Sequence, residues 1–334
     1  MARTLQDQIL NEIISRFPKR SVAVEALAEL LGVRKDAIYR RLREDTILSP
    51  NEINLLAQTY KISVDSYIFN QSDALLFSYS GFAREINNMG DYLDGVAENL
   101  ERTKQLPDVV LYYAASEVNF FYYNFFPELM NFKLYIWGRA IWEFDHLKNR
   151  PFDFEVISHA EMEKTQTILK SFLSINTKEL WSPNILFNTL AQIEYFLSMG
   201  VFRNNSDALI ICDRMSQLVD HWQLMAESGT KFALDAGPDS ALSTFELFHH
   251  EVLVTSDAIL VSSPAAKALF NIFNNPNYLL TSDETMCNHQ EDWFKKAIGK
   301  STPISLNNAK SRALYFNNLR SRIADTRLRI EQRL

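Results

Sequence analysis

Side chains with long-reaching hydrogen-bond donors are concentrated in residues 34–43 of this 334-residue chain. Arginine and lysine donate hydrogen bonds to phosphate oxygens and to base edges in the DNA major groove, so a helix face that carries them can recognise nucleic acid. The polar residues of this segment are Arg34, Lys35, Asp36, Tyr39, Arg40, Arg41 and Arg43. Apolar residues at helical spacing lie among them, which predicts a helix with one buried face and one charged face.

Two short helices within residues 22–43 must position these side chains. Gly32 lies between the helices, where a tight turn requires a backbone conformation that a side chain would strain. The apolar positions that would pack the two helices together are Leu27, Ala28, Leu31, Val33, Ile38 and Leu42. The pattern predicts a helix-turn-helix, and an ordinary αα-hairpin with a solvated basic face is the alternative.

Further helices are expected on both sides of this motif. Residues 4–17 have a helical pattern of apolar residues. Ser49-Pro50-Asn51-Glu52 is a strong helix start, because the serine can cap, the proline suits the first helical position and the glutamate can close a capping box. Ser63 is expected to cap a short fifth helix. Five short helices are therefore predicted in residues 1–70.

This order of helices resembles the lambda-repressor-like, or XRE-type, DNA-binding domain. The resemblance rests on Ala28, Gly32, Val33 and Ile38, followed by the helix ISVDSYI at residues 62–68. It implies that the second helix of the motif is a recognition helix for double-stranded DNA.

Arg41 departs from the family pattern, since the recognition helix often has an apolar residue there and Leu42 comes one position later. The whole chain also resembles a group of poorly characterised bacterial regulators that join such a domain to a long C-terminal region. That second resemblance rests on the segments NFFPELMNFKLYIW, LWSPNILFNTLAQIEYF and LLTSDETMCNHQEDWF, and it implies no known chemistry.

We expect the helix at residues 34–42 to enter the major groove of DNA. The side chains expected to read bases, or to support those that do, are Arg34, Lys35, Asp36, Tyr39 and Arg40. Those expected to contact phosphates are Lys19, Arg20, Arg41 and Arg43. A single small domain buries too little surface for tight specific binding, so a two-fold homodimer is expected.

The distribution of charge favours a site-specific binder over a protein that coats nucleic acid. The chain has a net charge of −7, but residues 1–70 contain ten Lys and Arg against nine Asp and Glu, while the remainder contains 24 against 32. A sequence-blind binder would obtain most of its affinity from counterion release and would need a stronger basic excess.

Several features predict a cytoplasmic protein without a membrane segment. The N-terminus lacks the apolar region of a signal peptide, and no stretch of about 18 uncharged apolar residues occurs. Cys212 and Cys287 lie far apart and belong to no CxxC motif. They are expected to be reduced, packed thiols, with a single disulfide as the alternative.

Residues 71–235 are predicted to form a helical effector or dimerisation region. Residues 71–83 are expected to be a strand or connector, and 109–113 a strand or the start of a helix. Helices are expected at 86–105, at 158–174, after Ser182 as a cap, and from 205 or 206 to about 231. The last two are expected to form an antiparallel pair.

Residues 236–334 are predicted to form a small α+β region. A border is expected at Ala236-Gly237-Pro238-Asp239-Ser240, followed by a β-hairpin around residues 255–257. Segments 266–273 and 278–280 would extend the same small antiparallel sheet, and Ser282 would cap a helix at 283–298. The final helix, 307–334, is expected to be a dimerising coiled coil, to supply extra phosphate contacts, or to be a solvated helix packed on its own domain. The fold class is thus mainly α, with a largely helical α+β C-terminal region.

The aromatic residues at 120–126 allow two interpretations. They could form a ligand pocket or dimer surface, or they could form hydrophobic core, and we favour the core. A small-molecule effector of the C-terminal region is therefore left open.

No motif of an enzyme is found. His249 and His250 are adjacent in an expected strand and point to opposite faces, and Cys287 and His289 are two residues apart on an expected helix, so neither pair suits one metal ion. GxGxxG, GxxxxGK[ST], GxSxG, HExxH and CxxC are absent. We therefore predict a DNA-binding transcriptional regulator that is not an enzyme and has no metal or cofactor. The alternatives are a protein-interaction or small-molecule-sensing module with the helix-turn-helix as a docking domain and, third, an enzyme in residues 71–334 without a linear motif.

Overall fold

The structure is a computed structural model that describes residues 4–60, 62, 64, 67, 75–79, 86–252 and 257–334. The chain divides into two compact units, Met1–Leu76 and Phe77–Leu334. Strands from both sides of the border expected at residue 236 share one sheet in the second unit.

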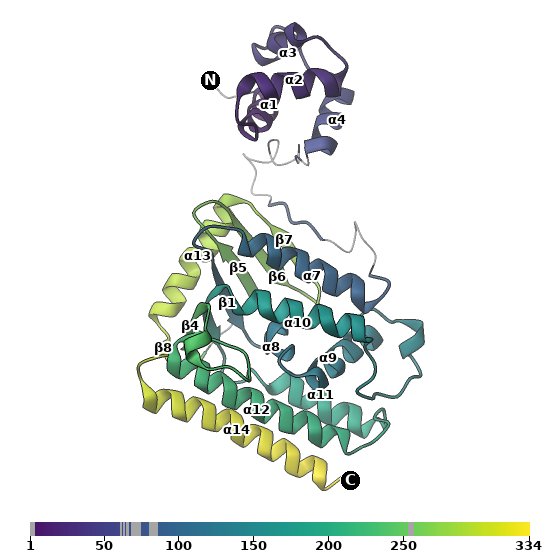
Figure 1. The fold of residues 1–334 in the computed structure, drawn as a ribbon, viewed down its shortest axis with the longest axis vertical. Helices are drawn as coiled ribbons and strands as arrows, with labels where there is room; N and C mark the ends of the chain where they lie inside the picture. Colours follow the sequence, from purple (N-terminus) through teal and green to yellow (C-terminus); the bar gives the residue numbers. More distant parts are fainter. Residues whose placement is uncertain are drawn as a thin grey trace. The chain divides into compact units, whose positions relative to one another are not determined.

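The first unit is helical in its described part (Figure 1). Its helices are α1 (Leu5–Ser15), α2 (Arg20–Leu31), α3 (Lys35–Leu42) and α4 (Pro50–Tyr60). Its core consists of apolar side chains at helical spacing, namely Ile9, Leu10, Ile13, Val24, Leu27, Ala28, Ile38, Leu48, Leu56 and Ile62. The fifth helix expected at Ser63 lies outside the described residues, as does most of the connector expected at 71–83.

The capping box predicted at the start of α4 is confirmed. The backbone N–H of Ser49 donates to Oε2 of Glu52 at 2.8 Å, and the N–H of Glu52 donates to Oγ of Ser49 at 3.3 Å. These reciprocal bonds satisfy amides that the first turn of a helix leaves without an internal partner.

In the residues that the structure describes, the second unit is built on an eight-stranded mixed sheet. Its strands are β1 (Val110–Ala115), β2 (Asn176–Trp181), β3 (Thr230–Lys231), β4 (Ser243–His249), β5 (Ala258–Ser262), β6 (Lys267–Ile272), β7 (Tyr278–Thr281) and β8 (Thr302–Pro303). The order is β3-β4-β2-β1-β5-β6-β7, with β8 also paired to β4. β2 is parallel to both β1 and β4. The expectation of a purely antiparallel sheet was therefore wrong, although β6 and β7 extend the sheet as predicted.

The β-hairpin expected around residues 255–257 is also wrong in its pairing. β4 and β5 are both strands, but β2 and β1 lie between them in the sheet. β4 and β5 follow each other in the sequence, but β4 pairs with β2 and β5 pairs with β1. Residues 253–256, at the expected turn, lie outside the described residues.

Helices cover both faces of this sheet (Figure 1). The remaining helices are α7 (Met89–Lys104), α8 (Phe120–Tyr123), α9 (Pro127–Ala140), α10 (His159–Leu173), α11 (Phe187–Ser198), α12 (Asp207–Ser228), α13 (Glu284–Gly299) and α14 (Ala309–Glu331), with 3-10 turns at Asp145–Leu147 and Pro238–Ser240. Side chains alternate along β1, so Leu111 and Tyr113 pack with α7 and α10, while Tyr112 and Ala114 pack with α13. Such two-sided burial places β1 in the middle of the core.

Local details of the second unit differ from expectation at three points. Residues 110–113 belong to strand β1, one of the two alternatives expected for 109–113, but β2 was not foreseen. Ser182 does not cap a helix at its own position, since its Oγ accepts the N–H of Asn184 in a turn and α11 begins only at Phe187. α13 is capped by Asp283, whose Oδ1 accepts the N–H of Met286 at 2.8 Å, and not by Ser282.

The final helix, α14, packs on its own unit. Its apolar stripe is buried, and its arginines pair with neighbouring helices: Arg320 with Asp220 of α12 at 2.8 Å, and Arg329 with Glu194 of α11 at 2.7 Å. These contacts favour the interpretation of α14 as a helix packed on its own domain. The aromatic residues of 121–126 are buried, with Tyr122 fully enclosed, whereas Phe120 is half-buried and lines a cavity.

Cys212 and Cys287 are buried and unpaired thiols. Burial raises the pKa of Cys212 to about 12. Among the described residues, no helix has the length and apolar character needed to cross a membrane.

Candidate nucleic-acid interface

The turn between α2 and α3 is closed by Gly32. This residue adopts the left-handed conformation, with φ 63° and ψ 32°, which a side chain would make costly. Its N–H donates to the carbonyl of Glu29 at 3.2 Å, and the N–H of Val33 donates to that of Ala28 at 3.0 Å. Ile38 of α3 is fully buried in the same core as α2. The turn at Gly32 and the shared core therefore fix the direction of α3 relative to α2.

One face of α3 carries exposed polar side chains. Lys35 and Asp36 lie in its first turn, Tyr39 and Arg40 lie one turn later, and Arg43 ends the helix. Positions four residues apart lie above one another on a helix, so these five side chains form a continuous outward stripe. Ile38, on the opposite side, is fully buried, and this contrast orients the helix.

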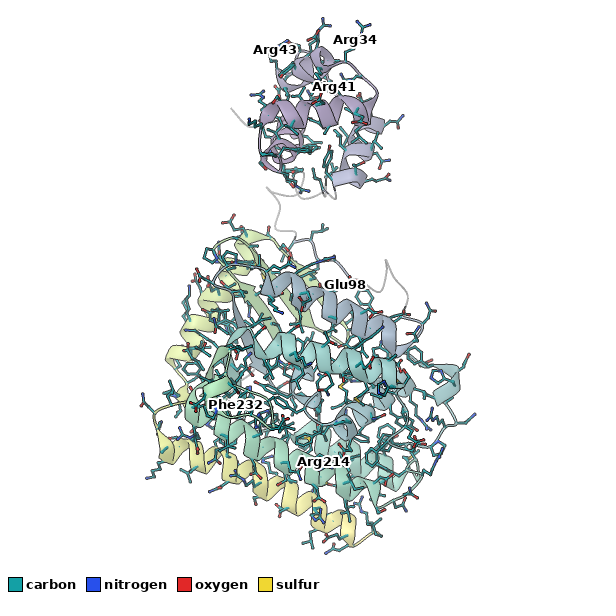
Figure 2. All side chains as sticks on the ribbon, in the orientation of Figure 1. Arg34, Arg41, Arg43, Glu98, Arg214 and Phe232 are labelled. Carbon is teal, nitrogen blue, oxygen red and sulfur yellow. The ribbon has the colours of Figure 1, made fainter. Side chains whose placement is uncertain are left out.

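Three further predicted residues flank the stripe. Arg34 is exposed at the N-cap of α3, and its side chain makes no capping hydrogen bond. Figure 2 shows the side chains of Arg34 and Arg43 projecting away from the first unit. Lys19 and Arg20 are exposed where α2 begins. Within the described residues, no side-chain partner is found for Lys19, Arg20, Arg34 or Arg40.

Two residues of the interface have acidic neighbours. Lys35 forms an ion pair with Glu25, whose pKa is lowered by the hydrogen bond from Lys35. Arg43 pairs with Asp45 at 3.0 Å. The side chains of all four residues are more than half exposed, so solvent screens these pairs and a stronger anion can displace the carboxylate.

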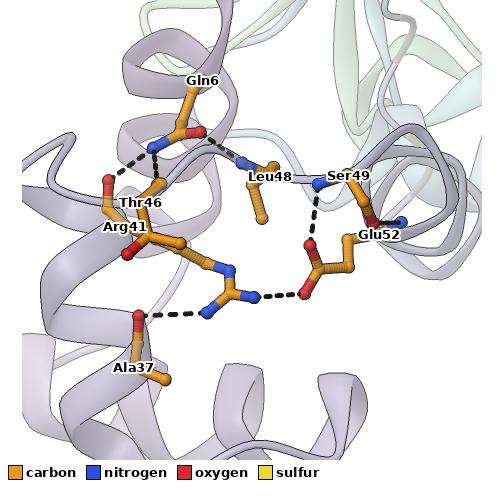
Figure 3. A network of polar contacts seen from close by, with 7 residues as sticks. All are labelled: Gln6, Ala37, Arg41, Thr46, Leu48, Ser49 and Glu52. Carbon is orange, nitrogen blue, oxygen red and sulfur yellow. Dashed lines mark hydrogen bonds and ion pairs between the residues drawn. The ribbon is translucent and has the colours of Figure 1, made fainter.

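Arg41 was expected to contact phosphate, but the structure holds its side chain away from solvent. Its side chain is only 11% exposed, and it turns inward to Glu52, where Nη2 lies 2.6 Å from Oε1 (Figure 3). Nη1 also donates to the carbonyl of Ala37 at 3.2 Å. The Arg41 side chain therefore ties α3 to α4.

Gln6 and Glu52 position α3, a role that was not predicted from the sequence. Nε2 of Gln6 donates to the carbonyls of Arg41 at 2.7 Å and Thr46 at 2.9 Å, and its Oε1 accepts the N–H of Leu48 at 2.6 Å (Figure 3). These bonds hold the end of α3 and the loop after it. The available signal was Arg41 itself, since an arginine at an apolar position needs a nearby carboxylate.

The pKa of Glu52 is lowered. Burial raises it, but the hydrogen bonds from Ser49 and the neighbouring guanidinium of Arg41 together outweigh burial. The carboxylate is thus charged near neutral pH and serves the α4 cap and the Arg41 pair together.

Comparison with protein-family models gave no match, and neither did comparison with curated proteins or with solved structures. Within the described ranges, no three His, Cys, Asp or Glu side chains are grouped so that they could hold a metal ion. The interface is therefore interpreted from its own geometry.

Proposed function

We propose that this protein is a sequence-specific regulator of transcription that binds double-stranded DNA through α3. The observation that carries the proposal is the outward stripe of α3, which stands on a buried apolar face and a glycine turn. Residues 34–43 contain five basic residues and one acidic residue. An α-helix fits the major groove, and its outward side chains then meet base edges.

The base-reading side chains are Arg34, Lys35, Asp36, Tyr39 and Arg40. Arginine can make a bidentate contact with guanine, and the carboxylate of Asp36 can accept a hydrogen bond from the amino group of cytosine. Arg34, Lys35 and Asp36 lie at the N-terminus of α3, where recognition helices contact base edges, and Tyr39 and Arg40 follow one turn later on the same face.

Lys19, Arg20 and Arg43 bind phosphates in this proposal. Lys19 and Arg20 lie at the first turn of α2, where the helix dipole also favours an anion. Arg41 is not part of the phosphate set, because its guanidinium is held by Glu52.

Binding as a homodimer is part of the proposal. An eight-residue recognition helix alone contacts few base pairs, and a two-fold pair doubles the site. Residues 77–334 would then serve as the oligomerisation or sensing region of a cytoplasmic regulator.

The test is selection of bound sequences from a random double-stranded DNA pool with the purified full-length protein. We expect enrichment of a two-fold symmetric site whose half-sites are spaced by about one helical turn. Affinity for that site, measured by fluorescence anisotropy, should fall steeply as salt concentration rises. Failure to enrich any sequence would reject the proposal.

A matched pair of variants separates specific recognition from bulk charge. Arg40→Ala and Arg102→Ala each remove one positive charge, but Arg102 is an exposed residue of α7 in the second unit. Only Arg40→Ala should weaken binding to the selected site. Equal losses would indicate a nonspecific electrostatic contact.

A docking domain for another protein is a second candidate. Ile47, in the loop between α3 and α4, is 83% exposed, and an apolar side chain so placed can anchor a partner. Salt distinguishes the two functions, because an apolar contact should hardly change with ionic strength.

A further inference from the structure

A cavity lies in the second unit between α7 and the antiparallel half of the sheet. Its volume is about 790 Å³, counting open space at its mouth. In Figure 1, α7 runs beside β6 and β7, and side chains of these elements, together with those of β1, β5 and α8, line the cavity. Aromatic side chains supply much of its wall, including Tyr92, Phe120, Phe270 and Tyr278. The enclosed space itself is about 90 Å³, so a ligand bound there would also occupy the open mouth of the cavity.

The cavity wall contains one acidic group. Asp257 lines the cavity, whereas no Lys, Arg or His among the described residues does so. Oδ1 of Asp257 accepts hydrogen bonds from the backbone N–H and the hydroxyl of Ser116, both at 2.7 Å. The carboxyl group is therefore held in a fixed position. An anionic ligand would be repelled by the carboxylate of Asp257, and no basic side chain of the described lining would offset that repulsion.

Burial disfavours the charged form of this carboxyl group. Desolvation raises the pKa of Asp257, although the two hydrogen bonds from Ser116 act in the opposite direction. The nearby charge of Glu117 raises it further. A cation brought next to the carboxylate would relieve both effects, since an opposite charge favours the ionised form.

Other polar groups of the wall form hydrogen bonds with neighbouring side chains. Nδ2 of Asn99 donates to the Tyr278 hydroxyl at 2.9 Å, and Nδ2 of Asn275 donates to Oε2 of Glu117 at 3.2 Å. The aromatic faces that remain can contact an apolar body and attract a cation.

We propose that this cavity binds a small organic cation, in which an aromatic or aliphatic body packs against the aromatic wall and one ammonium group pairs with Asp257. Binding is a property of the second unit alone. Only the further step, that the ligand controls DNA binding, rests on the proposed function.

The experiment measures binding of matched probes to the full-length protein by isothermal titration calorimetry without DNA. Three bodies, indolylethyl, phenylpropyl and octyl, are each tested as the amine, the alcohol and the carboxylate. We expect at least one amine to bind saturably and roughly tenfold or more tighter than its own alcohol, with the carboxylate weakest. The proposal is overturned if no amine binds or if each alcohol equals its amine.

Two variants locate the site. Asp257→Asn keeps the size of the side chain and an oxygen that can accept from Ser116, so it should abolish the preference for the amine while leaving the alcohol unchanged. Val96→Phe adds volume to the α7 wall and should weaken amine and alcohol alike. Asp239→Asn, at an exposed position, is the control and should change nothing. Retained amine preference in Asp257→Asn would refute the assignment, and circular dichroism verifies that each variant is folded.

A failure of this titration leaves the DNA-binding proposal intact, and a failure of DNA selection leaves the cavity proposal intact. If both succeed, adding the amine to the anisotropy assay shows whether the two sites are coupled.

Discussion

Positive charge is used in opposite ways at the exposed face of α3 in the first unit and at Lys133 in the second. In the first unit, Arg34 and Arg40 are exposed, and no partner is found for either among the described side chains. In the second unit, Lys133 is 1% exposed, and its Nζ lies 2.7 Å from Oε1 of Glu117 and 2.8 Å from Oε1 of Gln192. The charges of Arg34 and Arg40 are thus available to an external anion, whereas the charge of Lys133 is neutralised inside the fold.

This difference shows why counting basic residues does not locate a binding surface. Arg40 and Arg41 are adjacent in the sequence, yet Arg40 is exposed and Arg41 is held by Glu52. Burial and pairing decide which of them can reach a ligand. Each of the following variants tests that distinction.

The largest expected effect is that of Lys133→Met. It leaves the buried carboxylate of Glu117 without its cation, which typically costs about 3–5 kcal/mol of folding free energy. Denaturant unfolding followed by tryptophan fluorescence measures this, because all five tryptophans lie between residues 137 and 293 in the second unit.

Two controls accompany this variant. Lys148→Met breaks an exposed pair with Asp145 in the same unit and should leave the unfolding midpoint unchanged. Combining Lys133→Met with Glu117→Gln should restore most of the lost stability. A single Lys133→Met variant as stable as the parent would contradict the contrast between the units.

Arg40→Ala should weaken binding to the selected DNA site by about 1–3 kcal/mol if Arg40 contacts a base. Because the side chain is exposed, the stability of the first unit should not change. Anisotropy titration gives the first quantity and thermal unfolding the second. Unchanged affinity would remove Arg40 from the base-reading set.

Arg41→Ala should lower the stability of the first unit and leave its affinity for DNA unchanged. It removes the pair with Glu52 and the bond to Ala37, so the amides of α3 should lose protection by about 1–3 kcal/mol. Hydrogen exchange of peptides covering Lys35–Leu42 measures this loss. If protection is kept and only DNA affinity falls, Arg41 acts as a surface contact after all.

A smaller effect than those of Arg40→Ala and Arg41→Ala is expected on the salt dependence of DNA binding. Replacing Lys19 or Arg20 by Ala should lower the slope of log affinity against log salt concentration by about 1 for each phosphate contact removed. Arg41→Ala should leave that slope unchanged. Identical slopes in all three variants would show that Lys19 and Arg20 do not contact phosphate.

The smallest effect is a pH dependence of the first unit. Because the folded-state pKa of Glu52 is lowered from 4.5, its contribution to stability is fully present above that value and is lost as pH falls through the folded pKa. An acid titration of α3 amide protection measures it. The Glu52→Gln variant should lose stability at neutral pH and show a flatter acid profile.

Local signals in the sequence predicted local structure well. The Ser49–Glu52 capping box and the Gly32 turn were predicted from residues within one helical turn of each other, and the structure has the reciprocal bonds at Ser49 and a left-handed Gly32. The burial of Ile38 likewise followed from its spacing along α3.

Features set by distant residues were not predicted. β2 has the sequence NTKELW, whose polar residues conceal a strand that is parallel to both β1 and β4. The pairing of β4 and β5 with other strands depends on partners far along the chain. The inward position of Arg41 was not predicted for the same reason, because the residues that hold it, Gln6 and Glu52, lie well outside α3.

The sheet order has a consequence for how the protein is made. β1 and β2 leave the ribosome first, but their outer neighbours β5 and β4 follow only after residue 242. The nascent second unit therefore carries two unpaired strand edges while about sixty further residues emerge, and it needs protection during that interval. The first unit, made before it and built on local contacts, can fold meanwhile.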